Sequence, residues 1–350
     1  MPAETISALP VRRLVQAVVL VMVLAAVSVA APAAQPGAVP RVASIFYYPW
    51  YGTPATDGAW VHWGQNGHQP PDDVAAAYYP ARGLYSSSAA DVVQSQMDQI
   101  RDAGIDEISS SWWGKGSPED QRLGLVVAAA SRDSVAVAAH IEPYPGRSVA
   151  SVAADVAYLR GFGIHTFYIY RAFDFAPSDW APVLDALHKQ SVTVFAQTGL
   201  PGLAAAGHFD GVYTYDIVTY GGGFLVRYCS EAHALHLACA PSVGPGYEAL
   251  RGAGDPKVKP RSQGKTYDAM WQAAIAAGAD RVTITSYNEW GEGTQIEPAA
   301  PAYTAGGVAY GSYEGAYGMS GAASGYAYLV RTAYWTSLYH GPSKSRRRAH

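Results

Sequence analysis

The sequence predicts an α/β protein with a single (β/α)8 TIM-barrel domain. The chain has 350 residues and 49% hydrophobic residues, which is enough for one large core of this kind. Short runs of β-branched and aromatic residues alternate with alanine-rich stretches of helical character along most of the chain. Eight such runs can be counted, and eight parallel strands are the number that closes a barrel of this type.

The eight runs of β-branched or aromatic residues are the predicted strands. They are Val42–Tyr48, Ile105–Ser111, Val135–Ile141, Ile164–Tyr170, Val192–Ala196, Gly211–Tyr215, Leu235–Cys239 and Arg281–Tyr287. The predicted helices between them are Ala89–Ala103, Gln121–Ser131, Val149–Arg160, Ala181–Gln190, Gly202–Gly207, Gly222–Ala234 and Thr266–Ala277. Gly104, Gly163 and Gly278 stand where a helix is expected to end before the next strand begins. Strands that alternate with helices in this way are most simply parallel.

The two ends of the chain are predicted to lie outside the barrel. Two arginines precede an apolar run over residues 14–30, and cleavage of a signal peptide is expected near Ala33 or Ala34. The run is short for a membrane span, so an uncleaved N-terminal anchor is the alternative. We expect a secreted, extracellular protein that contacts a membrane only if the leader is uncleaved. The predicted divisions are a signal peptide (1–34), a linker (35–41), the barrel domain (42–342) and a disordered basic tail (343–350).

The composition excludes some classes of partner. Only 15% of the residues are charged and the net charge is -4, so no basic surface is available for nucleic acid or an anionic membrane. Aromatic residues make up 12% of the chain, and such rings suit the apolar faces and hydroxyl edges of sugars, although most are expected to pack in the core. No obligate protein partner is indicated. Cys229 and Cys239 form either one disulfide or two buried thiols.

Polar and aromatic residues collect at the predicted C-terminal strand ends, where barrel enzymes place their active sites. These residues are Tyr47, Tyr48, Trp50 and Tyr51 after the first strand, Trp112 and Trp113 after the second, His140, Glu142 and Tyr144 after the third, Tyr170 and Arg171 after the fourth, Tyr213 and Tyr215 in the sixth, and Asn288, Glu289, Trp290 and Glu292 after the eighth. Carboxylates therefore follow strands three and eight on one rim of the barrel.

The segment Asn288–Glu297 is the predicted catalytic region. Two glycines allow the backbone to turn tightly, so that Glu289 and Glu292 can face one small volume. Glycosidic cleavage needs two carboxyl groups, one protonated to assist the leaving oxygen and one ionised as nucleophile or base. Crowding and burial separate the pKa values of such a pair. The alternative on spacing alone is that these acids cap a helix or bind an ion. Their position on the rim favours catalysis by Glu289 and Glu292.

Other catalytic chemistries are poorly supported. His62, His68 and His140 have no zincin-like spacing, and no aspartate ladder resembles a calcium loop, so we predict no metal. The serine runs lack a nucleophile elbow, and no glycine-rich phosphate loop follows the first strand, so we predict no cofactor. His233 and His236 lie in an apolar stretch and are expected to have packing or surface roles.

Several collinear motifs resemble glycoside hydrolase family 99, the endo-α-mannosidases and related mannan-active bacterial enzymes. The resemblance runs from about Ser44 to Tyr339 and ends in a Glu-Gly-Thr-Gln-Ile-Glu segment. Each motif is weak alone, but their shared order is specific. The matching motifs are Phe46-Tyr47-Tyr48-Pro49-Trp50-Tyr51-Gly52, His62-Trp63, His140-Ile141-Glu142-Pro143-Tyr144, Phe209-Asp210-Gly211-Val212-Tyr213-Thr214-Tyr215, Gly244-Pro245-Gly246-Tyr247 and Thr285-Ser286-Tyr287-Asn288-Glu289-Trp290.

The resemblance implies a retaining, endo-acting hydrolase of α-mannosidic linkages in a polysaccharide or glycan, working without a metal. In such an enzyme Glu289 acts as base on the sugar 2-hydroxyl, which attacks C1 to give a 1,2-anhydro sugar, and Glu292 is the general acid. Proximity of the hydroxyl to C1 makes this chemistry feasible. Glu142 would accept hydrogen bonds from sugar hydroxyls. The expected substrate-binding residues are Tyr47, Tyr48, Trp50, His62, Trp63, Trp112, His140, Glu142, Tyr144, Tyr215, Asn288 and Trp290.

The chain departs from the family pattern at three places. Gly291 stands where the family usually has His, and Arg171 stands where it usually has Asp. The segment 251–254 is Arg-Gly-Ala-Gly where members often carry Arg-Pro-Trp-Asn. These differences bear on the substrate, which could be another α-linked polysaccharide or a differently branched mannan. Two alternative functions stay open: a carbohydrate-binding protein without turnover, and a related barrel protein of polysaccharide biosynthesis.

Overall fold

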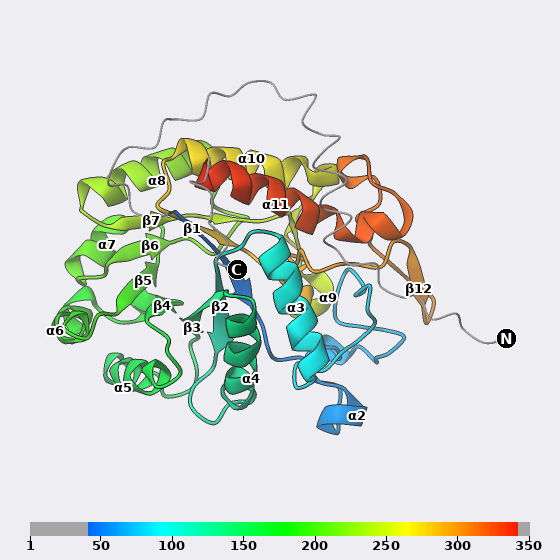
Figure 1. Ribbon diagram of the computed structural model, residues 1–350, viewed down its shortest axis with the longest axis horizontal. Coiled ribbons are helices and arrows are strands. Elements are labelled where there is room, and N and C mark those ends of the chain that lie inside the picture. Colours follow the sequence, from blue (N-terminus) through cyan, green and yellow to red (C-terminus); the bar gives the residue numbers. More distant parts are fainter. Residues whose placement is uncertain (1–40, 342–350) are drawn as a thin grey trace, which may run out of the picture.

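The computed structural model describes residues 41–341, and in this part of the chain nine parallel strands form the wall of a barrel (Figure 1). Their order around the wall is β7-β6-β5-β4-β3-β2-β1-β11-β8. The strands are β1 (Val42–Tyr47), β2 (Glu107–Trp112), β3 (Ala136–Ile141), β4 (Thr166–Ile169), β5 (Thr193–Gln197), β6 (Gly211–Tyr213), β7 (Ala238–Ala240), β8 (Ser242–Val243) and β11 (Arg281–Ile284). The predicted fold class is confirmed.

The barrel closes through a strand segment that is interrupted at Pro241. β7 pairs with β6, and β8 pairs with β11, so the stretch on either side of this proline bridges the two ends of the wall. Proline has no N–H to donate, but its carbonyl accepts a hydrogen bond from the Thr283 N–H at 3.2 Å. β7 and β8 therefore count as one strand of an eight-membered ring. The predicted strand Leu235–Cys239 was placed too early, because Leu235 caps the preceding helix.

Helices cover the outside of the barrel and separate successive strands (Figure 1). The seven predicted helices are all present, and α11 at the C-terminal end was not predicted. Trp335 of α11 stacks on Trp271 of α10, which fixes this last helix to the wall. The helices are α3 (Ala90–Asp102), α4 (Pro118–Arg132), α5 (Val149–Arg160), α6 (Pro177–His188), α7 (Pro201–Ala206), α8 (Gly223–Ala234), α10 (Lys265–Ala276) and α11 (Ala327–His340).

Loops at the strand ends carry shorter elements. An antiparallel pair, β9 with β10, lies between β8 and α10, and a second pair, β12 with β13, follows the last barrel strand. The disulfide Cys229–Cys239 joins α8 to β7, so the two cysteines are not free thiols. The short elements are α2 (Pro54–Asp57), η2 (Gln65–Gly67), η3 (Ala172–Asp174), β9 (Tyr247–Glu248), α9 (Leu250–Ala253), β10 (Val258–Lys259), η4 (Ser262–Gly264), η5 (Trp290–Glu292), β12 (Tyr303–Ala305), β13 (Val308–Tyr310), η6 (Ala316–Gly318) and η7 (Gly321–Tyr326).

The core has two layers because successive side chains of a strand point to opposite faces. The larger layer lies between strands and helices. In the smaller layer Phe46 of β1 contacts Tyr168 of β4 and Tyr213 of β6, which are not neighbours of β1, so this layer lies inside the ring. Its residues are Phe46, Tyr48, Ala138, Tyr168, Phe195, Tyr213, Tyr215 and Ala240. An ion pair between half-buried Arg281 and buried Glu107, 2.9 Å apart, lies at the start of β11 and β2. The interior is thus filled, and it forms the floor beneath the C-terminal mouth.

The predicted leader (1–34) and basic tail (343–350), and all of the linker except residue 41, lie outside the described residues. Among residues 41–341, no helix is both long enough and apolar enough to span a membrane.

Candidate active site

Glu289 and Glu292 lie on the turn that follows β11, at the C-terminal mouth of the barrel. The Glu289 N–H donates to Ser286 Oγ at 2.9 Å, and the Gly291 N–H donates to Glu289 Oε1 at 3.0 Å. Gly293 ends the turn in the left-handed region, with φ of 64°, which glycine adopts at little cost. The turn therefore holds both carboxyl groups in the mouth, as the sequence predicted from the strand order.

The two carboxyl groups have raised pKa values. Burial raises the pKa of Glu289 well above its ordinary value of 4.5, and the charges of Glu292 and Glu142 add to this effect. Burial also raises the pKa of Glu292 to about 7, although a hydrogen bond from Tyr215 opposes the shift. Two neighbouring carboxyl groups in a poorly solvated site resist ionising together. Near neutral pH the pair can therefore offer one acid and one base.

Two tyrosine hydroxyl groups connect the catalytic turn to the ends of β6 and β1. The Tyr215 hydroxyl donates to Glu292 Oε2 at 3.1 Å and lies 2.6 Å from the Tyr48 hydroxyl. Because Tyr215 has one proton to give, Tyr48 must donate to Tyr215 when Glu292 accepts. Tyr48 follows β1 and Tyr215 follows β6, so these two hydrogen-bonded hydroxyl groups join strands that are not neighbours in the wall.

Glu142 is a third carboxylate near the pair, and it follows β3. Its Oε1 atom accepts a hydrogen bond from Ser111 Oγ at 2.9 Å and lies 2.9 Å from His140 Nδ1. The other ring nitrogen of His140 lies 2.9 Å from the Tyr213 hydroxyl. His140 is thereby fixed behind Glu142 and is almost fully buried. Both residues were predicted as substrate-binding. The structure puts Glu142 close enough to the catalytic pair to raise both of their pKa values.

Trp50 and His62 form an aromatic platform beside Tyr48. Their rings stack with centroids 4.2 Å apart and an interplanar angle of 9°, and the Trp50 ring lies 4.6 Å from that of Tyr48. Burial lowers the pKa of His62 to about 4, so this imidazole is neutral at ordinary pH. A neutral flat surface of this kind suits the C–H face of a sugar ring.

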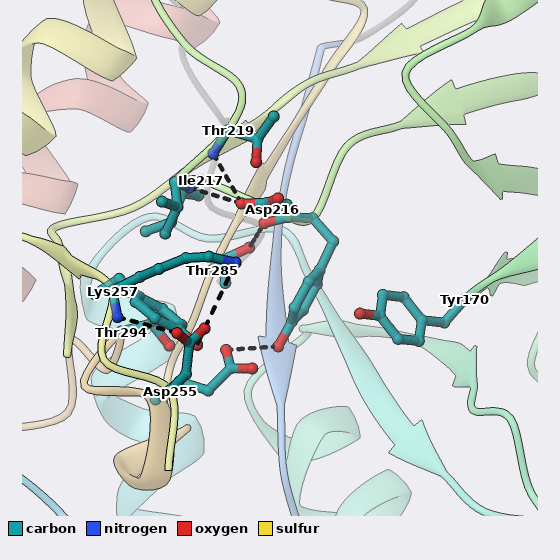
Figure 2. Close-up of a pocket in the computed structure, with 12 residues that line it drawn as sticks. Tyr170, Asp216, Ile217, Thr219, Asp255, Lys257, Thr285 and Thr294 are labelled. Carbon is teal, nitrogen blue, oxygen red and sulfur yellow. Dashed lines mark hydrogen bonds and ion pairs between the residues drawn. The ribbon is translucent and has the colours of Figure 1, made fainter. Parts of the chain in front are cut away.

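A cavity of about 190 Å³ adjoins Glu292 on the side of β6 and the β9–β10 hairpin. Figure 2 shows Tyr170 on one side of it, with Asp216, Asp255 and Lys257 on the other. The Asp255 carboxylate accepts hydrogen bonds from the Tyr247 hydroxyl and the Lys257 N–H, both at 3.0 Å. Sequence reasoning placed Tyr170 on the rim but did not assign Asp216, Asp255 or Lys257 to it. Asp216 could have been found in the same way, because it follows the predicted sixth strand directly.

Six predicted substrate-binding residues have their polar groups bound within the scaffold around the mouth. The Tyr47 hydroxyl donates to Gln96, and the Tyr144 hydroxyl contacts Ser151 and Asp155. The Asn288 side chain exchanges two hydrogen bonds with the Tyr48 backbone. Three buried indole N–H groups donate to protein oxygens: those of Trp63 to the Tyr85 carbonyl, Trp112 to Asp120 and Trp290 to Glu297. The neighbouring Trp113 is 36% exposed instead.

Fold and site together define a class of protein. A barrel whose C-terminal mouth holds two neighbouring carboxyl groups with raised pKa values, surrounded by tyrosine and tryptophan rings, fits the active site of a glycoside hydrolase. Within residues 41–341, no group of three or more His, Cys, Asp or Glu side chains is arranged to hold a metal ion.

The comparisons identify the family. The family model of Glycosyl hydrolase family 99 matches residues 39–341, and the chain belongs to this family. It is 32% identical to the glycoprotein endo-alpha-1,2-mannosidase of Rattus norvegicus, over 74% of this chain and 68% of the relative. It is also 32% identical to a glycoprotein endo-alpha-1,2-mannosidase-like protein of Danio rerio, over 74% and 71% of the two chains.

A solved structure supports the same assignment. The GH99 endo-alpha-mannosidase from Bacteroides thetaiotaomicron superposes with a TM-score of 0.73 and 30% sequence identity, covering 84% of this chain and 96% of that structure. The family recognised from the collinear motifs is thus confirmed, and the chain is a glycoside hydrolase.

Proposed function

We propose that the protein is an endo-acting hydrolase of α-mannosidic linkages in mannan or mannose-containing glycans. The observation that carries this proposal is the pair of neighbouring carboxyl groups of Glu289 and Glu292, both with raised pKa values, after β11 in a barrel of family 99. The names of the relatives from rat and from Bacteroides support the linkage. The mouth has the Trp50–His62 platform on one side and the cavity lined by Asp216 and Lys257 on another. This arrangement suits cleavage at an internal linkage of a longer glycan.

The proposed mechanism uses the sugar's own 2-hydroxyl as the nucleophile. Glu289 removes the proton of this hydroxyl, the oxygen attacks C1, and the bond from C1 to the leaving oxygen breaks as Glu292 donates a proton to that oxygen. Water then opens the 1,2-anhydro sugar at C1: Glu292 accepts the proton of the water, and Glu289 returns a proton to the 2-oxygen. Two inversions at C1 give overall retention. The Gly291 N–H favours the ionised form of Glu289 that this role requires, in opposition to burial and the charge of Glu292, which favour its protonated form.

The pH dependence follows from the required protonation states. Glu292 must be protonated for the first step, and its pKa is raised to about 7. Activity is therefore expected to fall as the pH rises through about 7. On the acid side activity falls when the second proton binds to the pair and neutralises Glu289. We expect a bell-shaped dependence of kcat/KM on pH for the wild-type protein.

The test of this function is a product analysis. The purified protein is incubated with α-mannans, α-glucans and high-mannose glycans, and the products are read by mass spectrometry and by NMR of the new reducing end. We expect oligosaccharides with α configuration from mannose-containing substrates. Glu289→Gln and Glu292→Gln should each remove this activity, and Glu231→Gln on the exposed face of α8 is the matched control.

Other results would replace this proposal. Release of monosaccharide alone would contradict the endo mode. Binding to glycans without any product would favour a carbohydrate-binding protein, and the absence of both would favour a role in polysaccharide synthesis. An unchanged rate in both Gln variants would remove the catalytic assignment.

Secretion is a further part of the proposal. The predicted leader over residues 1–34 supports it, and so does the Cys229–Cys239 disulfide, since such bonds persist in oxidising compartments. N-terminal sequencing of protein recovered from culture medium should find cleavage near Ala33 or Ala34. Recovery of the uncleaved chain in the membrane fraction would support an anchor instead.

A further inference from the structure

Helix α9 contacts the catalytic turn through two glycines. Gly252 is buried, and a Cβ atom built on it would lie 2.2 Å from the Gly291 carbonyl oxygen and 2.4 Å from Gly291 Cα. The two backbones therefore meet directly, with no room for a side chain on Gly252. Both glycines belong to segments that the sequence analysis singled out, and the structure shows that these segments touch.

The contact reaches the catalytic carboxylate through one residue, Gly291, whose carbonyl and Cα meet Gly252 and whose N–H binds Glu289. The Gly291 N–H donates to Glu289 Oε1 at 3.0 Å, and a Cβ atom on Gly291 would lie 3.0 Å from the same oxygen. The position of Gly291 therefore decides whether Glu289 receives its hydrogen bond. Gly252 packs directly against the carbonyl and Cα of Gly291, the residue that donates this hydrogen bond.

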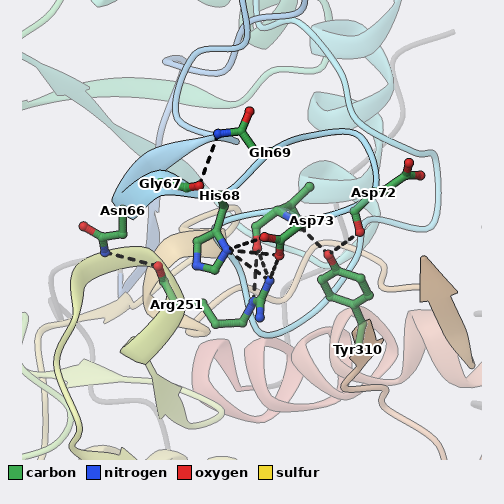
Figure 3. Close-up of polar contacts among 9 residues, drawn as sticks. Asn66, Gly67, His68, Gln69, Asp72, Asp73, Arg251 and Tyr310 are labelled. Carbon is green, nitrogen blue, oxygen red and sulfur yellow. Dashed lines mark hydrogen bonds and ion pairs between the residues drawn. The ribbon is translucent and has the colours of Figure 1, made fainter. Parts of the chain in front are cut away.

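The other side of α9 is anchored to the loop around η2 (Figure 3). Asn66 Nδ2 donates to the carbonyl oxygens of Arg251 at 3.1 Å and Gly252 at 2.8 Å. The Arg251 guanidinium donates twice to the Val74 carbonyl, at 3.1 and 3.0 Å, and pairs with Asp73. These contacts come from both the backbone and the side chain of α9, so the helix cannot retreat from the turn without breaking them.

We propose that Arg251 and Gly252 form a strut that positions the Gly291 N–H against the Glu289 carboxylate. Arg251 and Gly252 are positioning residues in this account, because neither acts on the reacting atoms. The strut would set the proton affinity of Glu289, and its importance for turnover rests on the proposed role of Glu289 as base.

Loss of the strut should change the pKa of Glu289 in a defined direction. A hydrogen bond to the charged form of a carboxyl group lowers its pKa, so loss of the Gly291 bond should raise the pKa of Glu289 further. Other groups that face Glu289 act on the same titration. They are Glu292 on η5, Glu142 after β3, Tyr48 and Tyr51 after β1, and Tyr215 after β6.

The test is a direct titration of Glu289 that needs no substrate. The protein is labelled with 13C at glutamate carboxyl groups, in a Glu292→Gln background that removes the coupled partner, and Glu289→Gln identifies the resonance. Gly252→Ala is compared with Gly124→Ala, the same change at an exposed position of α4 where the new methyl meets no atom within 4 Å. We expect Gly252→Ala to raise the pKa of Glu289 by about one unit, and Gly124→Ala to leave it unchanged.

A second variant keeps the test decisive if Gly252→Ala does not fold. Arg251→Ala removes the side-chain contacts to Asp73 and Val74 without adding an atom and keeps the backbone contacts to Asn66, so it should shift the Glu289 titration in the same direction by a smaller amount. A folded Gly252→Ala or Arg251→Ala protein in which Glu289 titrates as in the control would overturn the strut. When the same variants carry the native Glu292, the acid side of the pH profile of kcat/KM should move to higher pH by the same interval. If no mannan is cleaved but the resonance shifts, the strut stands and the proposed substrate fails.

Discussion

The Tyr215 hydroxyl should tune the general acid, and Tyr215→Phe tests this. The hydroxyl donates to Glu292 Oε2 at 3.1 Å, and this bond holds down a pKa that burial has raised to about 7. Hydrogen bonds to charged groups contribute about 1.5–3 kcal/mol, and 1.36 kcal/mol corresponds to one pKa unit. Glu292 is only half-buried, so water can replace part of the lost bond, and the lower end of this range applies.

The expected result is a pKa for Glu292 that is higher by about one unit in Tyr215→Phe. Because Glu292 acts as the acid, the protonated form persists to higher pH, and the basic limb of kcat/KM moves upward by the same interval. The assay is kcat/KM on a defined α-mannan between pH 5 and 10, with the exposed Tyr334→Phe as matched control. A basic limb that stays in place or moves downward would refute the reasoning.

The remaining predictions concern stability, each measured by urea denaturation. Arg281→Met leaves the buried Glu107 without its partner and should lower the free energy of unfolding by about 3–5 kcal/mol, and adding Glu107→Leu should restore most of it. Glu297 accepts from three donors in the buried network behind the catalytic turn, and Glu297→Gln replaces one of its two acceptor oxygens by an NH2 group, which should cost about 1–3 kcal/mol. Replacing Cys229 and Cys239 together by Ser should cost about 2–3 kcal/mol, since the bridge closes a loop with a sequence separation of 10. In each case a loss below about 0.5 kcal/mol would contradict the assigned contact.

Strand periodicity and strand order were enough to predict the barrel and the position of the catalytic pair. The pair comes directly after β11, and parallel strands place such residues at one mouth. The seventh strand was misplaced because the end of α8 at Leu235 is as apolar as a strand, and because Pro241 interrupts the true segment. Local composition could not resolve this, since the pairing of β8 with β11 is a long-range contact.

The site itself was predictable in part. Tyr47 and Tyr48 are consecutive, so they must point to opposite faces, and only Tyr48 reaches the mouth. The same alternation separates buried Trp112 from exposed Trp113. The alternation of side chains along a strand could therefore have shown which residue of each pair is buried away from the mouth. The contribution of Asp255 could not be seen, because the β9–β10 hairpin folds back over the mouth through tertiary contacts that have no strand-end signal.

The division of labour between Glu289 and Glu292 is the central claim, and pre-steady-state release of nitrophenol from a nitrophenyl α-mannobioside tests it most directly. This leaving group needs no protonation, so the first step can proceed without the general acid. We predict a burst of nitrophenol with Glu292→Gln, because the anhydro sugar still forms but breaks down slowly. Glu289→Gln should show neither burst nor turnover. A burst with Glu289→Gln, or equal loss of the burst in both variants, would contradict the account.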